Sequence, residues 1–201
     1  MFRTNSQLAG AVAGVAVLAA AAINSNPAGA DAVPTLTPEP PDWYTCQTTG
    51  NGTVCKGTTE FQHVGEYDGA CPGGFDILEN GHSVRNAHRY YNRNGLLERR
   101  LATDIFPVGD PLNIVYNSVT GKAIPYRADL HTTDILGVPG DLASVTSTQT
   151  GNLYTITTPG QGLMVHDTGL FTFSPEGDIL KDHGPKMLFS GDVEKLCAAL
   201  S

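Results

Sequence analysis

Turn signals recur along this chain at intervals of about 8 to 12 residues, and they constrain its fold more than any other feature. Between them lie short runs rich in β-branched and aromatic residues, and helical periodicity is almost absent outside the C-terminal end. This alternation is typical of an antiparallel all-β domain whose consecutive strands pair as hairpins. The clearest turns are Asn94-Gly95, Thr120-Gly121-Lys122, Thr150-Gly151-Asn152, Asp167-Thr168-Gly169 and Pro175-Glu176-Gly177-Asp178.

Consecutive hairpins predict an up-and-down meander. So many strands cannot stay flat and open without exposing edges, so we expect the sheet to close as a lipocalin-like barrel or to bend strongly into a half-barrel. The predicted strands cover residues 43–48, 53–62, 74–79, 84–91, 96–106, 112–117, 123–130, 143–149, 153–157, 162–167, 169–173 and 179–183.

The four cysteines allow three pairings, and their spacing favours one of them. If Gly50-Asn51 forms a two-residue type II′ turn, Cys46 faces Cys55 at a non-hydrogen-bonded pair, with Cα atoms about 4.5 Å apart. That separation is near the lower edge of disulfide geometry. Cys71 is then left to pair with Cys197. No Cys-x-x-Cys pair is present, so a zinc site is the less favoured interpretation.

One helix is predicted, at the C-terminus. Val193, Leu196, Cys197 and Leu200 recur at helical spacing and form one apolar face, with charged residues on the other side. Ser190 or Asp192 is available as the N-cap. We therefore expect Cys197 to face the protein body, which agrees with a bridge to Cys71.

The first 32 residues resemble a secretory signal in their composition. Arg3 supplies a positive start, residues 8–23 are uncharged, and Ala30-Asp31-Ala32 gives the small-x-small cleavage pattern. Cleavage there would leave a mature protein beginning at Val33. Residues 33–42 are rich in proline and predict an extended, mobile lead-in, and residues 43–201 form the expected domain. We predict a secreted, extracellular protein with no membrane span.

The formal net charge of −8 argues against general affinity for nucleic acid or anionic lipid. Positive charge is nevertheless concentrated between residues 82 and 100. With interleaved tyrosines, this segment can present an anion-binding strip to an acidic surface, for which Arg85, Arg89 and Arg93 are the candidates. The alternative is a solvated hairpin whose charges protect a sheet edge.

Arg99 is a separate case within this segment. It lies two residues from both Leu97 and Leu101, so it faces the core if they do, and a buried guanidinium needs an acidic partner such as Asp76 or Glu60. A bulge in the strand would remove this requirement.

A barrel interior of about eight strands either is filled by side chains or holds one small ligand. For the second case the sequence predicts an apolar-ligand site. Its candidate residues are Tyr91, Arg99, Tyr116, Tyr126, Phe171 and Phe173. The same residue types are equally expected in an ordinary core.

Other chemistry is weakly indicated. His166-Asp167 and Asp182-His183 fall on segments that we expect to pair, but a one-residue slip in register would separate them, so no metal site is predicted. No hydrolase signature and no cofactor motif occurs, and no catalytic residue is assigned. The carboxylates Glu60, Glu66, Asp68 and Asp76 can include an acid and base pair, but the sequence does not select two.

The chain resembles a group of small secreted actinobacterial proteins of unknown function that carry four cysteines. The resemblance covers roughly residues 43–201 and implies a secreted disulfide framework; it brings no assigned catalytic or binding residue. The segments that carry it are Cys71 with Phe75-Asp76-Ile77, Tyr90-Tyr91-Asn92-Arg93-Asn94-Gly95-Leu96, Thr120-Gly121-Lys122, Pro159-Gly160-Gln161-Gly162, Asp167-Thr168-Gly169 and Leu196-Cys197-Ala198-Ala199-Leu200.

Three functions follow as hypotheses. The first is a secreted carrier that binds a small apolar molecule. The second is an extracellular interaction protein that presents the Arg-rich 82–100 hairpin to an anionic partner. The third is a secreted hydrolase or isomerase with carboxylate or histidine chemistry, which a pocket enclosing two acids, or a histidine beside an acid and a hydroxyl, would favour.

Overall fold

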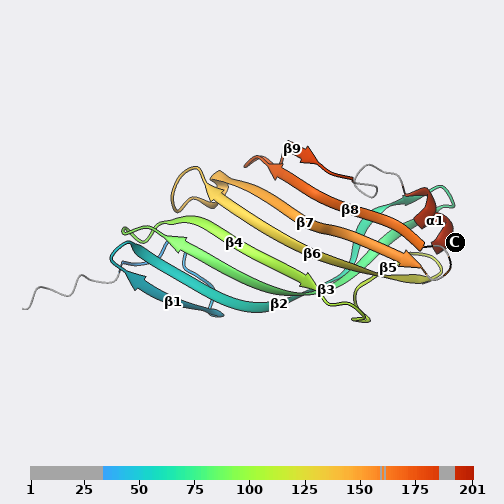
Figure 1. Ribbon diagram of the computed structural model, residues 1–201, viewed down its shortest axis with the longest axis horizontal. Helices are drawn as coiled ribbons and strands as arrows, with labels where there is room; N and C mark the ends of the chain where they lie inside the picture. The colour runs from blue at the N-terminus through green and yellow to red at the C-terminus, as the bar shows by residue number, and fades with distance from the viewer. Residues whose placement is uncertain (1–33, 159, 161, 186–192) are drawn as a thin grey trace, which may run out of the picture. The chain divides into compact units, whose positions relative to one another are not determined.

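The computed structural model describes residues 34–158, 160, 162–185 and 193–201. Within these residues the chain forms one antiparallel sheet and one C-terminal α-helix (Figure 1). The elements are β1 (Tyr44–Thr49), β2 (Gly52–Cys71), β3 (Phe75–Tyr91), β4 (Leu97–Phe106), β5 (Ile114–Asn117), β6 (Ala123–Leu136), a 3₁₀ turn (Leu142–Ser144), β7 (Val145–Thr158), β8 (Gly162–Phe173), β9 (Ile179–His183) and α1 (Glu194–Leu200).

The strands are arranged as a meander in the order β1-β2-β3-β4-β6-β7-β8-β9. β5 continues the line of β4, because β3 pairs with β4 over Val84–Tyr91 and with β5 over Ile77–Asn80. The predicted antiparallel all-β meander with a C-terminal helix is therefore confirmed. No pairing joins β1 to β9 within the described residues, so the sheet keeps two edges, as in the more open of the two predicted forms.

Several strands are longer than predicted, and two predicted turns are wrong. Thr150-Gly151-Asn152 lies inside β7 and Asp167-Thr168-Gly169 lies inside β8. Gly151 and Gly169 face each other across these strands. A Cβ on Gly151 would lie 2.3 Å from the carbonyl oxygen of Asp129, so glycine serves close strand approach here and not chain reversal.

The first hairpin has the predicted register, with Cys46 opposite Cys55 and Thr49 opposite Gly52. The Cys46–Cys55 and Cys71–Cys197 disulfides are both present, as predicted. The predicted turn type is wrong. A type II′ turn needs a positive φ at Gly50, whereas the positive φ, of 133°, occurs at Gly52.

The larger hydrophobic core lies where α1 packs against the sheet. Leu196, Cys197 and Leu200 are buried, as the helical spacing predicted. Val193 occupies the N-cap position without a side-chain hydrogen bond, and the predicted caps at 190 and 192 lie outside the described residues. The sheet residues of this core are Cys71, Phe75, Ile77, Val115, Ile124, Tyr126, Ala128, Tyr154, Ile156, Met164 and Val165.

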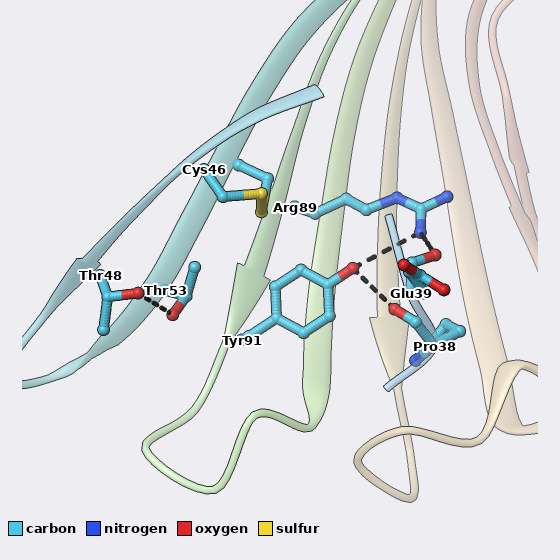
Figure 2. Close-up of a disulfide and its surroundings, with 8 residues drawn as sticks. Pro38, Glu39, Cys46, Thr48, Thr53, Arg89 and Tyr91 are labelled. Atoms are coloured by element: carbon cyan, nitrogen blue, oxygen red, sulfur yellow. Dashed lines mark hydrogen bonds between the residues drawn. A yellow bond between two sulfur atoms is a disulfide. The ribbon is translucent and has the colours of Figure 1, made fainter. Parts of the chain in front are cut away.

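A smaller core of Cys55, Tyr91, Leu97 and Leu136 lies at the other end of the strands and packs against Leu36. The segment preceding β1 is attached there through its backbone. The Thr37 N–H donates to the carbonyl of Gly95 at 2.8 Å, and the Thr37 carbonyl accepts from Leu97 N at 2.9 Å. The Tyr91 hydroxyl donates to the carbonyl of residue 38 at 2.9 Å (Figure 2). The predicted signal segment lies outside the described residues.

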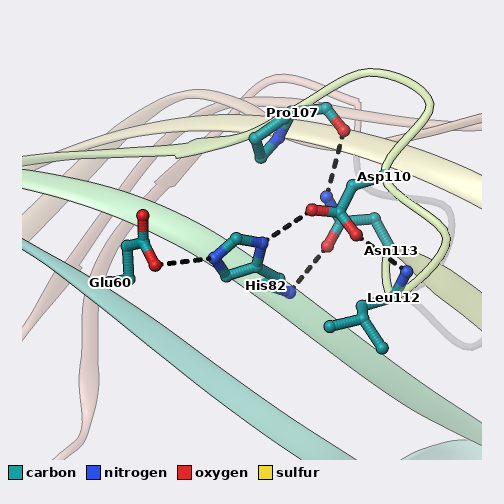
Figure 3. Close-up of polar contacts among 6 residues, drawn as sticks. All are labelled: Glu60, His82, Pro107, Asp110, Leu112 and Asn113. Carbon is teal, nitrogen blue, oxygen red and sulfur yellow. Dashed lines mark hydrogen bonds and ion pairs between the residues drawn. The ribbon is translucent and has the colours of Figure 1, made fainter.

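The 107–113 loop fills the gap between β4 and β5. Asn113 is fully buried; its Oδ1 accepts from His82 N at 2.7 Å and its Nδ2 donates to the Pro107 carbonyl at 3.1 Å (Figure 3). His82 Nδ1 lies 2.6 Å from Asp110 Oδ2, and this contact raises the pKa of His82. These polar contacts therefore take the place of β-ladder hydrogen bonds on β3, between the segment that pairs with β4 and the segment that pairs with β5.

No helix in the described part of the chain is both long and apolar enough to cross a membrane.

Candidate functional site

The residues predicted to bind a ligand do not converge. Tyr91 and Arg99 line a cleft of about 640 Å³ beside the β3–β4 turn. Tyr126 lines a different cleft of about 560 Å³. Phe171 and Phe173 stack on each other along β8 at 5.7 Å and line neither cleft. Tyr116, half-buried on β5, also lies outside both.

Arg99 is exposed and not buried, so the predicted pair with Asp76 or Glu60 does not form. The cause is a bulge. Tyr90 pairs with Arg99 but Tyr91 pairs with Leu97, so one extra residue shifts the side-chain alternation. The guanidinium of Arg99 instead lies over the Tyr90 ring, 4.2 Å from its centroid.

Acidic partners neutralise part of the arginine-rich segment. Arg85 binds the buried Asp104 through Nε at 2.5 Å and Nη2 at 2.8 Å. Arg100 binds Asp134 at 2.8 Å. These two arginines therefore form ion pairs within the chain, and both side chains remain partly exposed.

The remaining two candidates of this strip contact neutral groups. Arg89 Nη1 lies 3.5 Å from both the Tyr91 hydroxyl and the backbone carbonyl of Glu39 (Figure 2). Arg93 donates to Asn51 Oδ1 at 3.0 Å. The strip thus carries less free positive charge than its composition indicates.

The histidine and aspartate pairs considered for a metal are not brought opposite each other. His166 pairs with Thr155 of β7, whereas Asp182 of β9 pairs with Phe171. Within the described residues no group of three or more histidine, cysteine or acidic side chains is placed to hold a metal ion.

A cleft formed by β2, β3, β4, β6 and β7 does combine acidic, basic and aromatic side chains. We refer to it as the acidic cleft. Its volume of about 560 Å³ is within the range of small-molecule sites. It is lined by His63, Glu66, Tyr67, Asp68, Glu79, Phe106, Tyr126, Ala128, Leu130, Leu153 and Tyr154.

Asp68 and Glu79 form the polar centre of the acidic cleft. Glu79 is 8% exposed, and its Oε1 lies 3.0 Å from His63 Nε2. The Tyr154 hydroxyl donates to Asp68 Oδ2 at 3.3 Å. Burial, and then the charge of Glu79 and a hydrogen bond with it, raise the pKa of Asp68 to about 7, against the opposing bond from Tyr154. Asp68 therefore holds a proton in mildly acidic solution.

Two irregularities in β2 position this part of the cleft. The register with β3 shifts between Val64 and Glu66 and again between Tyr67 and Gly69. At the first shift Gly65 has a φ of 72°, and its N–H donates to Asn80 Oδ1 at 2.9 Å. Bulges of this kind redirect side chains from the regular alternation and are frequent beside functional sites.

Tyr126 forms an apolar wall of the acidic cleft and also carries an unused polar atom. Its ring stacks on Tyr154 with centroids 4.5 Å apart and packs against Phe106. The residue is 4% exposed, and its hydroxyl has no hydrogen-bond partner among the described residues. Burial, followed by the charge of Glu79 and the closeness of its carboxyl group, raises the pKa of this hydroxyl, so it stays protonated.

Gly81 makes this arrangement possible. A Cβ at this position would lie 2.0 Å from His63 Cε1 and 2.6 Å from the Tyr126 hydroxyl oxygen. Both side chains therefore converge over a backbone that has no side chain of its own.

Sequence reasoning named Glu66, Asp68 and Tyr126 but missed His63, Glu79 and Tyr154. A signal for Glu79 was available. It lies at two-residue spacing from the core residue Ile77, so the alternation of β3 places its carboxylate on the core face. Of the other carboxylates considered, Glu60 lies 3.6 Å from His82 Nε2 (Figure 3) and Asp76 lies outside the acidic cleft.

Comparison with known proteins finds no matching family model, no matching curated protein and no matching solved structure.

Proposed function

We propose that this protein is secreted and binds a small organic molecule in the acidic cleft. The observation that carries the proposal is the fully buried Tyr126 hydroxyl, which has no partner among the described residues and borders a cleft of about 560 Å³. An unsatisfied buried polar group costs roughly 1–3 kcal/mol, and a ligand that supplies the missing hydrogen bond would recover part of that cost.

The lining of the cleft suits a ligand with an apolar body and a few polar atoms. Phe106, Leu130, Leu153 and Tyr154 supply apolar contact area, and the carboxyl pair supplies directional polar contacts. This is the usual composition of small-molecule sites. The cleft replaces the barrel interior that the sequence led us to expect as the binding site.

Secretion is supported by three features. The first residues have the composition of an export signal, and both disulfides involve residues after it. Disulfides persist in oxidising compartments. The resemblance to small secreted actinobacterial proteins points the same way.

The proposal is tested with N-phenyl-1-naphthylamine, a neutral probe whose fluorescence rises in apolar sites. We expect saturable binding that Leu130→Trp abolishes, because the larger side chain fills the cleft. Leu180→Trp is the control, since Leu180 is 58% exposed on β9 and lies outside the cleft. Equal binding by both variants, or no saturable binding to the unmodified protein, would exclude the cleft as an apolar site.

A hydrolase or isomerase would use the same residues. His63 beside Glu79 and Tyr154 beside Asp68 are pairs able to move a proton. The two functions are distinguished by mass spectrometry of a molecule captured from culture supernatant. A binding protein returns it unchanged, whereas an enzyme converts it on incubation.

A further inference from the structure

We infer that the ligand of the acidic cleft is an organic ammonium ion with an aromatic or aliphatic body, held by Asp68, Glu79 and the hydroxyl oxygen of Tyr126. This inference rests on the proposed function and specifies its ligand class.

The lining of the cleft is predominantly acidic. Glu66, Asp68 and Glu79 contribute three carboxyl groups, and no lysine or arginine belongs to the described lining. His63 is the one basic side chain there, and its ring nitrogen contacts Glu79. A ligand carboxylate or phosphate would meet repulsion in such a site, whereas a cation would be attracted.

Tyr126 supplies a contact that an ammonium group can use. Its buried oxygen has no partner, and a phenol oxygen accepts hydrogen bonds through its lone pairs. An ammonium group has three N–H donors to share among the two carboxyl groups and this oxygen. The space that Gly81 leaves brings the Tyr126 oxygen close to the His63–Glu79 pair.

The aromatic walls favour the same ligand class. Phe106 packs against Tyr126, and Tyr126 stacks on Tyr154, with centroids 5.7 Å and 4.5 Å apart; all three line the cleft. Aromatic rings attract a nearby cation, and they also cover the apolar body attached to it. Aromatic and acidic groups together are therefore better matched to an amine than to a neutral hydrocarbon.

Binding of a cation would be linked to protonation of Asp68. Asp68 faces Glu66 of its own strand, Glu79 of β3, Tyr126 of β6 and Tyr154 of β7. His63 of β2 contacts Glu79. The pKa of Asp68 is raised to about 7, chiefly by burial and by Glu79, so acid solution leaves a proton where the ammonium group would bind. Affinity should thus rise with pH, and binding should release a proton.

Three probes of matched shape test the inference by isothermal titration calorimetry: phenethylammonium, 2-phenylethanol and phenylacetate. We expect phenethylammonium to bind best and to bind about 30-fold more tightly at pH 8.0 than at pH 5.5, the limit for displacement of one proton with a pKa of about 7. Titration in two buffers of different ionisation enthalpy measures the proton released.

The outcomes separate the inference from the proposed function. If 2-phenylethanol binds as tightly as phenethylammonium, or if the affinity for phenethylammonium decreases as pH rises, the ammonium assignment is wrong while the cleft remains a binding site. If N-phenyl-1-naphthylamine binds but none of the three probes does, the assignment is also wrong. If no probe binds, both proposals fail.

Two variants assign the contacts. Glu79→Gln should weaken phenethylammonium binding at least tenfold, with Glu176→Gln in the exposed β8–β9 turn as its control. Tyr126→Phe removes one oxygen and no packing surface, so it should fold normally and still lose several-fold affinity. Unchanged phenethylammonium affinity in both cleft variants would overturn the inference.

Discussion

Replacement of Gly81 by alanine tests the architecture of the acidic cleft directly. The added Cβ would lie 2.0 Å from His63 Cε1 and 2.6 Å from the Tyr126 hydroxyl oxygen, and such distances force a side chain to move. The His63 side chain is 24% exposed and has a route to solvent, whereas Tyr126 is 4% exposed. We therefore expect His63 to turn outward and to lose its contact with Glu79.

The size of the stability loss follows from the Glu79 carboxylate, which the movement of His63 leaves without its contact. A buried carboxylate that loses a hydrogen bond costs roughly 1–3 kcal/mol, and overpacking without movement costs a similar amount. Gly81→Ala should therefore raise the equilibrium constant for unfolding about 5- to 150-fold. Urea denaturation followed by Trp43 fluorescence measures this change.

Gly50→Ala is the matched control, because a Cβ there meets no atom within 4 Å and Gly50 has no positive φ. Its unfolding free energy should change by no more than about 0.5 kcal/mol. The reasoning is refuted if Gly81→Ala unfolds at the same urea concentration as the unmodified protein and the NMR signals of the His63 ring do not shift.

Three other predictions concern the framework. Replacing Cys71 and Cys197 by serine opens a loop with a sequence separation of 126 and should lower the free energy of unfolding by about 5 kcal/mol on the chain-entropy model. Removing the hairpin disulfide, with its separation of 9, should lower it by about 3 kcal/mol. Equal losses of unfolding free energy in urea denaturation would contradict this. Asn113→Ala leaves the His82 N–H without its acceptor and should cost roughly 1–3 kcal/mol, and an unchanged unfolding midpoint would count against the role of this loop. Contact with Asp110 raises the pKa of His82, so the stabilisation from this contact is fully present below about pH 6.5 and is lost as pH rises through the higher pKa of the folded protein. His82→Gln should therefore flatten the dependence of the unfolding free energy on pH over that range. If the variant and the unmodified protein show parallel dependences, the assignment is refuted.

The parts of the fold that local rules determine could be predicted. The Gly50-Asn51 hairpin has a register that follows from counting outward, and that register brings Cys46 opposite Cys55. Helical spacing placed Cys197 on the buried face of α1, where it reaches Cys71. Both results depend on a fixed period of two or of 3.6 residues and need no long-range information.

Irregularities in these two periods are the reason that other parts of the fold and the candidate site could not be predicted. Arg99 is exposed because one extra residue in β4 reverses the alternation of inward and outward side chains, and no residue type in β4 predicts that bulge. Gly151 was assigned to a turn because glycine favours turns, whereas here it permits close strand approach. The acidic cleft depends on two register shifts in β2 and on strands distant in sequence, so its members could be named as carboxylates and aromatics but not brought together.

The protonation of buried Asp68 beside Glu79 is the central claim, and the carboxyl carbon of Asp68 reports it. Its NMR chemical shift followed against pH in the ligand-free protein should give a midpoint near 7 in place of the ordinary 3.8, because burial and Glu79 disfavour the charged form. In Glu79→Gln the midpoint should fall. A midpoint near 4 in both proteins would show that the cleft neither desolvates Asp68 nor couples it to Glu79, and the account of the site would be wrong.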